Sequence, residues 1–238
     1  MLEWTGERFL PNIDPLLTEP EIHFEHLHRY AFAMEFVKGK DVLDLASGEG
    51  YGSYFLSKAA NRVIGIDING DAVIHAQQTY VRPNLEFLQG DIRNIPIEGQ
   101  KLFDVVVCFE VLEHIEEHEQ LLSEIKRLLK ENGSLLISTP NKITYSDERN
   151  YKNPFHQREL DSSEFQELLR KYFSNVCILG QKISNGSYIY EFNKTHSSPG
   201  DEYYLERENE SYSFTNKKAT PMYFLAVASE KKLEHAFS

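Results

Sequence analysis

The stretch DVLDLASGEGYGS, residues 41–53, decides the fold of this chain, because it joins an apolar strand to a helix through three closely spaced glycines. We predict a strand over residues 41–46 and a helix over residues 51–60. Glycines at such a turn let the backbone approach a ligand, and the following helix offers free N–H groups. The turn therefore predicts a site for a nucleotide or a nucleoside-like cofactor. A purely geometric role for the glycines is the alternative.

Apolar strands alternate with amphipathic helices on both sides of this turn. The further predicted helices cover residues 21–37, 70–81, 119–133 and 161–173. The further predicted strands cover residues 62–67, 85–89, 103–109, 133–139, 175–183 and 221–229. This alternation indicates an α/β fold with a parallel sheet covered by helices on both faces. The last two strands have no helix between them, so we expect them to pair as an antiparallel hairpin.

The bulk composition excludes several classes of protein. The 238 residues, 41% of them hydrophobic and 26% charged, suit one large globular domain. A formal net charge of −12 argues against a nucleic acid partner, which usually requires a broad basic face. No apolar run approaches the roughly 18 residues of a membrane span, and the N-terminus does not resemble a signal peptide. We therefore expect a cytoplasmic protein whose two cysteines, Cys108 and Cys177, are buried reduced thiols.

Three acidic residues narrow the choice of cofactor. Asp67 ends the second predicted strand, where a carboxylate can accept both hydroxyls of a ribose, although a dinucleotide-binding enzyme would need the same residue. Asp91 follows the third strand, where it could accept the amino group of an adenine. Asp44 lies just before the glycine turn and suits a positively charged amino group better than a pyrophosphate. One acid each for an amine, a ribose and an adenine favours S-adenosylmethionine over a dinucleotide.

Five motifs of the chain resemble, in order and spacing, those of the class I S-adenosylmethionine-dependent methyltransferases. They lie within about residues 40–141 and read VLDLASGEGYGS, VIGIDI, LQGDI, FDVVVCFEVLEHI and LLKENGSLLISTPN. The resemblance implies a Rossmann-like, mainly parallel sheet of seven strands, with S-adenosyl-L-methionine as the cofactor. Ala46 departs from the family pattern, which usually has the first glycine of the turn there. We expect the small alanine side chain to preserve the close approach of the backbone.

The same resemblance implies which residues contact the cofactor. Those expected to hold its methionine part are the turn residues Ala46, Ser47, Gly48 and Gly50. Those expected at its nucleoside are Asp67 on the ribose, Ile68 packed on the adenine, and Asp91 with Ile92 at the adenine edge. Phe109 would lie beside the reactive methyl group. In the first helix, Arg29 and Tyr30 are candidates for the cofactor carboxylate, and the alternative is a surface arginine beside a core tyrosine.

A cluster of potential ligands follows the fourth strand. Glu110, Glu113 and His114 are spaced i, i+3 and i+4, so they would share one face of a helical turn at the carboxyl end of the sheet. With His156, they resemble the Glu-x-x-Glu-His motif and later histidine of certain small-RNA 2′-O-methyltransferases. The ubiquinone-pathway O-methyltransferases carry a similar motif. That resemblance implies a divalent metal, Mg or Mn, held by Glu110, Glu113, His114 and His156 near the acceptor hydroxyl.

Two alternatives to this metal site stay open. In a metal-free site, His156 or His114 would act as the general base. In a structural reading, the cluster only caps the turn, and the acidic run after it is a solvated helix start.

The segments expected around the acceptor are less distinctive. WTGERFLP before the first helix and NPFHQREL after the fifth strand resemble bacterial methyltransferases of sugar and polysaccharide modification. We expect both to border the acceptor cleft. The expected division of the single domain is an N-terminal cap and helix (1–38), a cofactor-binding core (40–184), a polar flap (185–220) and a last strand (221–230).

The expected activity is O-methylation of a hydroxyl on a small-molecule or sugar-type acceptor. Three alternatives remain at this point. The chain could methylate an amine, for example on an amino sugar. It could be a catalytically silent cofactor-binding partner subunit, which the departure at Ala46 would suit. It could also be a nicotinamide-dependent oxidoreductase, since Asp67 serves a dinucleotide equally well.

Overall fold

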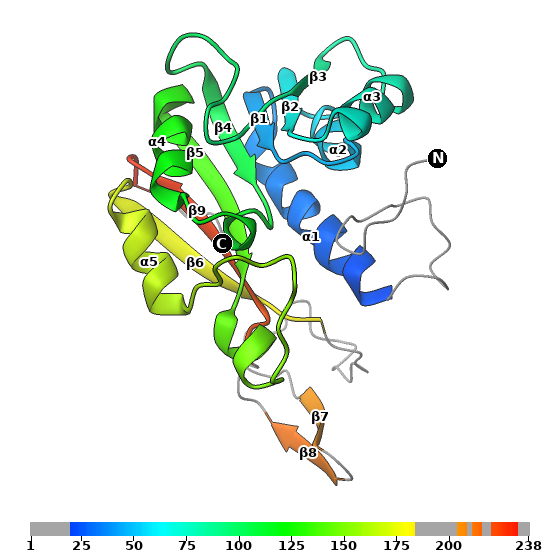
Figure 1. Ribbon diagram of the computed structural model, residues 1–238, viewed down its shortest axis with the longest axis vertical. Coiled ribbons are helices and arrows are strands. Elements are labelled where there is room, and N and C mark those ends of the chain that lie inside the picture. Colours follow the sequence, from blue (N-terminus) through cyan, green and yellow to red (C-terminus); the bar gives the residue numbers. More distant parts are fainter. Residues whose placement is uncertain (1–19, 184–203, 209–210, 216–219, 233–238) are drawn as a thin grey trace, which may run out of the picture.

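The computed structural model describes residues 20–183, 204–208, 211–215 and 220–232 (Figure 1). Its helices are α1 (Pro20–Val37), α2 (Tyr51–Leu56), α3 (Gly70–Thr79), the 3₁₀ turn η1 (Leu112–His114), α4 (His118–Leu128), the π-helical turn η2 (Ile143–Asp147) and α5 (Ser162–Arg170). Its strands are β1 (Asp41–Leu45), β2 (Arg62–Asp67), β3 (Leu85–Gln89), β4 (Phe103–Cys108), β5 (Leu129–Pro140), β6 (Asn175–Gln181), β7 (Tyr204–Glu208), β8 (Ser211–Thr215) and β9 (Tyr223–Ser229).

Seven of the strands form one sheet, in the order β3-β2-β1-β4-β5-β9-β6. The first five in this order pair in parallel, whereas β9 runs antiparallel to both of its neighbours, β5 and β6. The predicted Rossmann-like sheet with an antiparallel C-terminal pair is therefore confirmed. The strand order reverses between β1 and β4, and the crevice beyond the carboxyl ends of such strands is where open α/β sheets bind ligands.

Helices cover both faces of the sheet (Figure 1). Side chains along a strand alternate between the faces, so Val42 packs with α1 and α2 while Leu43 packs with α4 and α5. Two buried apolar clusters result, one on each side of the sheet. Asp44 falls on the same face as Val42, which places its carboxylate under α1 and α2 instead of in the apolar core beneath α4.

One predicted boundary is wrong at the end of α4. The helix ends at Leu128, not at Gly133, because Leu129 adopts an extended conformation and pairs with Phe103 of β4. Gly133 instead lies within β5. A Cβ at Gly133 would come within 2.7 Å of the Leu129 side chain and 3.0 Å of the Asp104 carbonyl oxygen. The glycine therefore permits close packing of β5 against β4, and it does not stop a helix.

Smaller corrections concern three other helices and one cysteine. Helix α2 ends at Leu56, α3 at Thr79 and α5 at Arg170, all short of the predicted ends. Both cysteines are free, and Cys108 is fully buried as predicted. Cys177 is only partly buried, because it lies in β6 at the edge of the sheet, where one side of the strand has no neighbour.

Two predicted segments fall largely outside the described residues. These are the first part of the N-terminal cap, residues 1–19, and most of the polar flap, residues 184–203. Within the described part of the flap, β7 and β8 pair as a separate antiparallel hairpin, which the sequence did not predict.

Candidate active site

The glycine turn after β1 is built from left-handed residues at alternating positions. The backbone angle φ is 54° at Ala46, 55° at Gly48 and 88° at Gly50. Glycine adopts this conformation freely, whereas alanine adopts it at a cost of about 1–2 kcal/mol. The side chain of Ala46 is exposed at the edge of a cavity, so it does not block the turn. A Cβ at Gly48 would meet nothing within 4 Å, which leaves open space beside the backbone there.

Asp67 ties the end of β2 to this turn. One carboxylate oxygen accepts the N–H of Gly48 and the other accepts the N–H of Asn69, both at 2.8 Å. Both oxygens keep further lone pairs, so the carboxylate can accept additional hydroxyl donors while its position is fixed by the backbone.

A cavity of about 340 Å³ opens beside the turn. Ile68 and Ile92 line it with apolar surface, and Asp67 and Asp91 line it with carboxylates. The Ile68 residue is 64% exposed, so its apolar surface is available to pack against a ligand in the cavity. Arg93 binds Asp91 through a 2.8 Å ion pair, and these hydrogen bonds lower the pKa of the Asp91 carboxyl. Two apolar side chains and two acids suit a nucleoside.

Asp44 lies beneath the turn and is fully buried. The Ser53 hydroxyl donates to it at 2.6 Å, and the Tyr30 hydroxyl lies 3.3 Å from both of its oxygens. Burial raises the pKa of Asp44 from 3.8 to about 7, although these two hydroxyls partly offset the shift. Asp44 does not line the cavity, so its role toward an amino group stays a prediction.

This pKa predicts how stability changes with pH. Because the folded-state pKa of Asp44 is raised, folding favours its protonated form. The stabilisation is fully present below the unfolded-state pKa of 3.8 and is lost as the pH rises through about 7. We expect the urea unfolding free energy of the cofactor-free chain to fall less steeply between about pH 5 and 8 in Asp44→Asn than in the unchanged chain. Equal slopes of the unfolding free energy against pH in the variant and the unchanged chain would show that Asp44 does not titrate in this range.

Arg29 and Tyr30 of α1 are both buried. The Arg29 guanidinium lies 4.5 Å from the centre of the Tyr223 ring, and its Nε donates to Gln181 at 2.8 Å. Its Nη2 lies 3.5 Å from Glu110, yet Nη1 and Nη2 make no hydrogen bond with any described residue. The alternative of a surface arginine is therefore wrong. The two guanidinium nitrogens can hold a further carboxylate.

The Tyr30 side chain, in contrast, is held by contacts with other residues of the protein. Its hydroxyl faces Asp44, and its ring packs edge-on against Phe109, with 5.3 Å between the ring centres. A Cβ at Gly52 would lie 2.0 Å from the Tyr30 ring, so the glycine makes room for it. Tyr30 and Phe109 are parts of the core that supports the end of β4.

Glu110 does not share a helical face with the rest of its cluster, so that prediction is wrong. It precedes η1 and adopts a left-handed conformation with φ of 52°. Its side chain accepts a 2.6 Å hydrogen bond from the Ser138 hydroxyl, whose oxygen also accepts the Glu110 N–H. The left-handed residue turns the Glu110 carboxylate toward Arg29 instead of toward the histidines.

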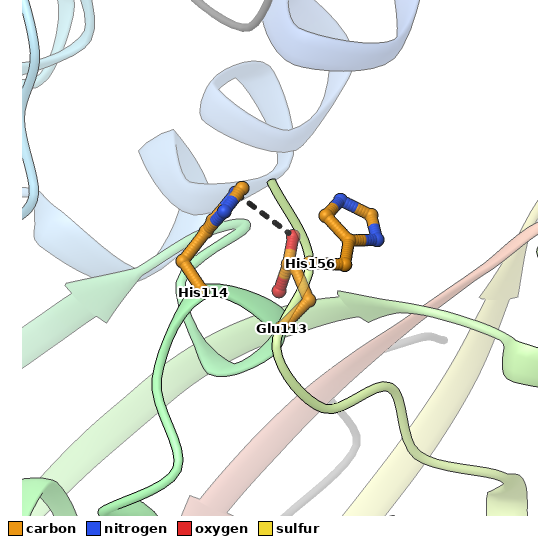
Figure 2. A group of neighbouring side chains, drawn as sticks. All are labelled: Glu113, His114 and His156. Carbon is orange, nitrogen blue, oxygen red and sulfur yellow. Dashed lines mark ion pairs between the residues drawn. The ribbon is translucent and has the colours of Figure 1, made fainter. Parts of the chain in front are cut away.

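Glu113, His114 and His156 do come together, as Figure 2 shows. One ligand atom from each residue lies within 4.8 Å of the other two. The carbonyl oxygen of Glu113 accepts the N–H groups of Gln157 and Arg158, which fastens the loop after η2 onto η1. This contact explains how His156 reaches a site 40 residues earlier in the chain. The rings of His114 and His156 are 5.1 Å apart.

The hydrogen bonds around the two imidazoles leave the same ring nitrogen facing the site. Nδ1 of His156 lies 2.6 Å from the Glu159 carboxylate, and Nδ1 of His114 lies 3.2 Å from the Phe155 carbonyl oxygen. An imidazole beside such an acceptor carries its proton on Nδ1, so Nε2 presents a lone pair. Nε2 of His156 is in contact with the Asn153 amide at 3.1 Å.

The electrostatics of Glu113 are unusual. Its side chain is 1% exposed, and burial, followed by the nearby Glu110 charge, raises its pKa well above 4.5. A cation among the three side chains would offset both effects and favour the ionised carboxylate.

Several neighbours of the site were missed by sequence reasoning. Gln157 lines the cavity, Arg93 binds Asp91, and Ser138 holds Glu110. Arg93, Gln157 and Glu159 each had a local signal, because they lie within three residues of Asp91 or His156. The contact between Ser138 and Glu110 joins separate elements, so no spacing along the chain predicts it.

Comparisons with known proteins identify the family. A family profile described as a methyltransferase domain matches residues 36–208. A Mycolicibacterium smegmatis protein named as a probable S-adenosylmethionine-dependent methyltransferase is 38% identical over 173 residues, which cover 71% of this chain and 63% of that protein. The chain belongs to the class I S-adenosylmethionine-dependent methyltransferases. All the proposed site residues of this methyltransferase except Arg29 and Tyr30 lie within the matched region.

Two further similarities extend this result. A ubiquinone biosynthesis O-methyltransferase of Glaesserella parasuis is 34% identical over 110 residues, 44% of this chain and 47% of that protein. The structure of a methyltransferase from Archaeoglobus fulgidus shares the fold, with a TM-score of 0.57, 17% identity and coverage of 87% and 92%. The methyltransferase chain spans less than two thirds of the length of these two curated relatives. Among its described residues, no helix combines the length and apolar character needed to cross a membrane.

Proposed function

We propose that this methyltransferase transfers a methyl group to a hydroxyl oxygen of a small-molecule acceptor. The observation that carries the proposal is the Glu113–His114–His156 cluster, which borders the cofactor cavity through His114. A hydroxyl must lose its proton to attack a methyl group. An imidazole Nε2 or a bound cation next to the cofactor serves that need.

The residues that line the cavity suit the proposed cofactor, S-adenosylmethionine. The adenine would pack between Ile68 and Ile92 with Asp91 at its edge, and Asp67 would accept the ribose hydroxyls. The turn Ala46–Gly50 would border the methionine part. The Nη1 and Nη2 atoms of Arg29, which make no hydrogen bond with any described residue, favour a role in binding the cofactor carboxylate. When bound, S-adenosylmethionine supplies an electrophilic methyl group, and the chain positions the acceptor oxygen against it.

A divalent metal fits three of the four residues proposed for it. Ligands that share one tetrahedral ion at about 2.0–2.2 Å lie about 3.3–3.6 Å apart. The ligand atoms of Glu113, His114 and His156, which lie within 4.8 Å of one another, would therefore have to move closer by up to about 1.5 Å to share an ion. The Asn153 contact with His156 would have to break. Glu110 would need a different side-chain orientation to join the set. Two imidazoles and a carboxylate suit Mn, Fe or Zn, and also Mg with added water ligands.

A metal-free mechanism rests on the His156–Glu159 pair. The two side chains are almost fully buried and lie 2.6 Å apart. A carboxylate on Nδ1 fixes the tautomer in which Nε2 carries the lone pair. Nε2 could then take the proton of an acceptor hydroxyl once its contact with the Asn153 amide breaks. Under this alternative, His156 is the general base, and Glu113 and His114 only shape its surroundings.

The choice of oxygen as the methylated atom is supported by the O-methyltransferase relative, whose name states that chemistry for that protein. The resemblance of residues Glu110 to His114 to the Glu-x-x-Glu-His motif of such O-methyltransferases adds to this support. Methylation of an amine needs no nearby base once the amine is neutral, so the imidazole pair favours a hydroxyl.

Calorimetry with S-adenosylhomocysteine tests the cofactor part of the proposal. We expect binding in the micromolar range, because the nucleoside would be enclosed by two isoleucines and two acids. NAD serves as the matched probe, since it shares the adenosine but adds a pyrophosphate that faces Asp67 and Asp91. Binding of NAD without binding of S-adenosylhomocysteine would overturn the proposal. Binding of S-adenosylhomocysteine without methyl transfer to any hydroxylated acceptor would favour the silent subunit.

A further inference from the structure

A second hollow, of about 460 Å³, adjoins the histidine pair at His156. Its walls come from η2 and from the loop between η2 and α5. His156 and Gln157 line this hollow, while His114 and Gln157 line the cofactor cavity. The two spaces therefore adjoin at the His114–His156 pair, with Gln157 common to both. A group bound in the second hollow can reach both the pair and the border of the cofactor cavity.

The lining of this hollow differs in character from that of the cofactor cavity. Within the described part of the chain it has no aliphatic residue, whereas four branched aliphatic residues line the cofactor cavity. Besides His156 and Gln157, the polar residues that line the hollow are Lys142, Ser146, Asp147, Asn150, Lys152, Asn153 and Glu159. The positive and negative groups balance, so the hollow does not select a strongly charged ligand. It offers many hydrogen-bond donors and acceptors instead.

Two features indicate that this hollow binds a ligand. The Ser146 hydroxyl oxygen is buried, yet it makes no hydrogen bond with any described residue. A buried hydroxyl without a partner is costly, and a ligand hydroxyl would relieve that cost. Tyr151 lines the same wall and is 45% exposed, while the Arg149 guanidinium lies over its ring, 5.6 Å from the ring centre. An exposed aromatic face in a polar hollow suits the C–H face of a sugar ring, which is apolar while its rim carries hydroxyls.

We propose that this hollow is the acceptor subsite and that it takes a polyhydroxylated ring of the sugar type. The assignment rests on the proposed methyl transfer, because it identifies the ring hydroxyl nearest His156 as the one that is methylated. An acyl chain is disfavoured, since it would find no aliphatic wall on which to bury its methylene groups. Tyr151 would stack on the ring, and Ser146 and the two asparagines would hold the remaining hydroxyls.

Saturation-transfer NMR on the full chain with S-adenosylhomocysteine tests this assignment. The probes are methyl α-D-glucopyranoside, methyl α-D-mannopyranoside, L-rhamnose and decanoate. We expect saturation transfer to at least one of the three sugars and none to decanoate. In Tyr151→Ala, the sugar signal should fall at least about fivefold, as expected for loss of a stacking contact of roughly 1 kcal/mol or more. Ser146→Ala should reduce it as well.

Phe155→Ala is the matched control, because Phe155 is an exposed ring in the same loop that does not line the hollow. Its sugar signal should equal that of the unchanged chain. Saturation of decanoate in place of the sugars would overturn the assignment, and so would a sugar signal that survives both Tyr151→Ala and Ser146→Ala. An absent sugar signal also overturns it. Calorimetric binding of S-adenosylhomocysteine, measured on the same samples, shows separately whether the proposed cofactor site holds.

Discussion

His156→Ala is expected to lower the rate of methyl transfer about 10²- to 10⁴-fold, the range found when a positioned acid or base is removed. His156 lies 5.1 Å, ring to ring, from His114 and is held by Glu159, so no other described imidazole can take its place without moving. Single-turnover transfer of labelled methyl to an acceptor measures the effect. His75→Ala is the control, because His75 lies on α3, outside the cluster.

The same variant separates the metal mechanism from the general-base mechanism. If the cluster holds an ion, chelation abolishes transfer, added Mn or Mg restores it, and Glu113→Gln loses rate as severely as His156→Ala. Manganese binding, followed by electron paramagnetic resonance, would then disappear in both variants. If His156 acts as a base, chelation has no effect and Glu159→Gln slows the reaction. Unchanged transfer in His156→Ala would contradict both mechanisms and leave the cluster a structural turn.

Asp67→Ala is expected to weaken the binding of S-adenosylhomocysteine about 10- to 100-fold. The carboxylate accepts two backbone N–H groups and is proposed to accept the ribose hydroxyls, and each hydrogen bond to a charged group contributes about 1.5–3 kcal/mol. Part of that energy is lost from the turn itself, so the binding loss corresponds to roughly 1.4–2.8 kcal/mol. Isothermal calorimetry measures it directly.

Two companion variants make this result interpretable. Asp67→Asn keeps one acceptor oxygen and should lose less affinity than Asp67→Ala. Asp71→Ala removes an exposed acid four residues away, in the first turn of α3, and should bind as the unchanged chain does. Affinity that is unaffected by Asp67→Ala would show that the ribose is bound elsewhere. Thermal unfolding of each variant separates a loss of binding from a loss of folding.

The order and type of most core elements could be predicted from residue patterns alone. Strands β1, β2, β3 and β4 are short apolar runs, and the helices between them repeat apolar residues at helical spacing, so local periodicity carried the information. The end of α4 could not be predicted, because Leu129 is an acceptable helix residue whose extended conformation comes from pairing with Phe103. The edge position of β6, which leaves Cys177 partly exposed, likewise depends on where β9 inserts.

The residues proposed to bind the cofactor could also be predicted from local sequence patterns. Asp67 and Asp91 come directly after strands, and parallel strands bring their carboxyl ends to one edge of the sheet. The sequence by itself therefore determined the fold class, the family and the position of the cavity, since these depend on motifs within about a hundred consecutive residues.

The tertiary structure decided the details that depend on contacts between distant segments. It turned Glu110 toward Arg29 through a left-handed residue, against the helical spacing that grouped it with Glu113. It brought His156 to His114 through backbone hydrogen bonds from the Gln157 region to Glu113. It also buried Arg29 with two guanidinium nitrogens that make no hydrogen bond with any described residue. Spacing along the chain fixes which residues share a strand or helix face, but a site assembled from α1, η1 and a loop 40 residues later exists only after these segments pack together.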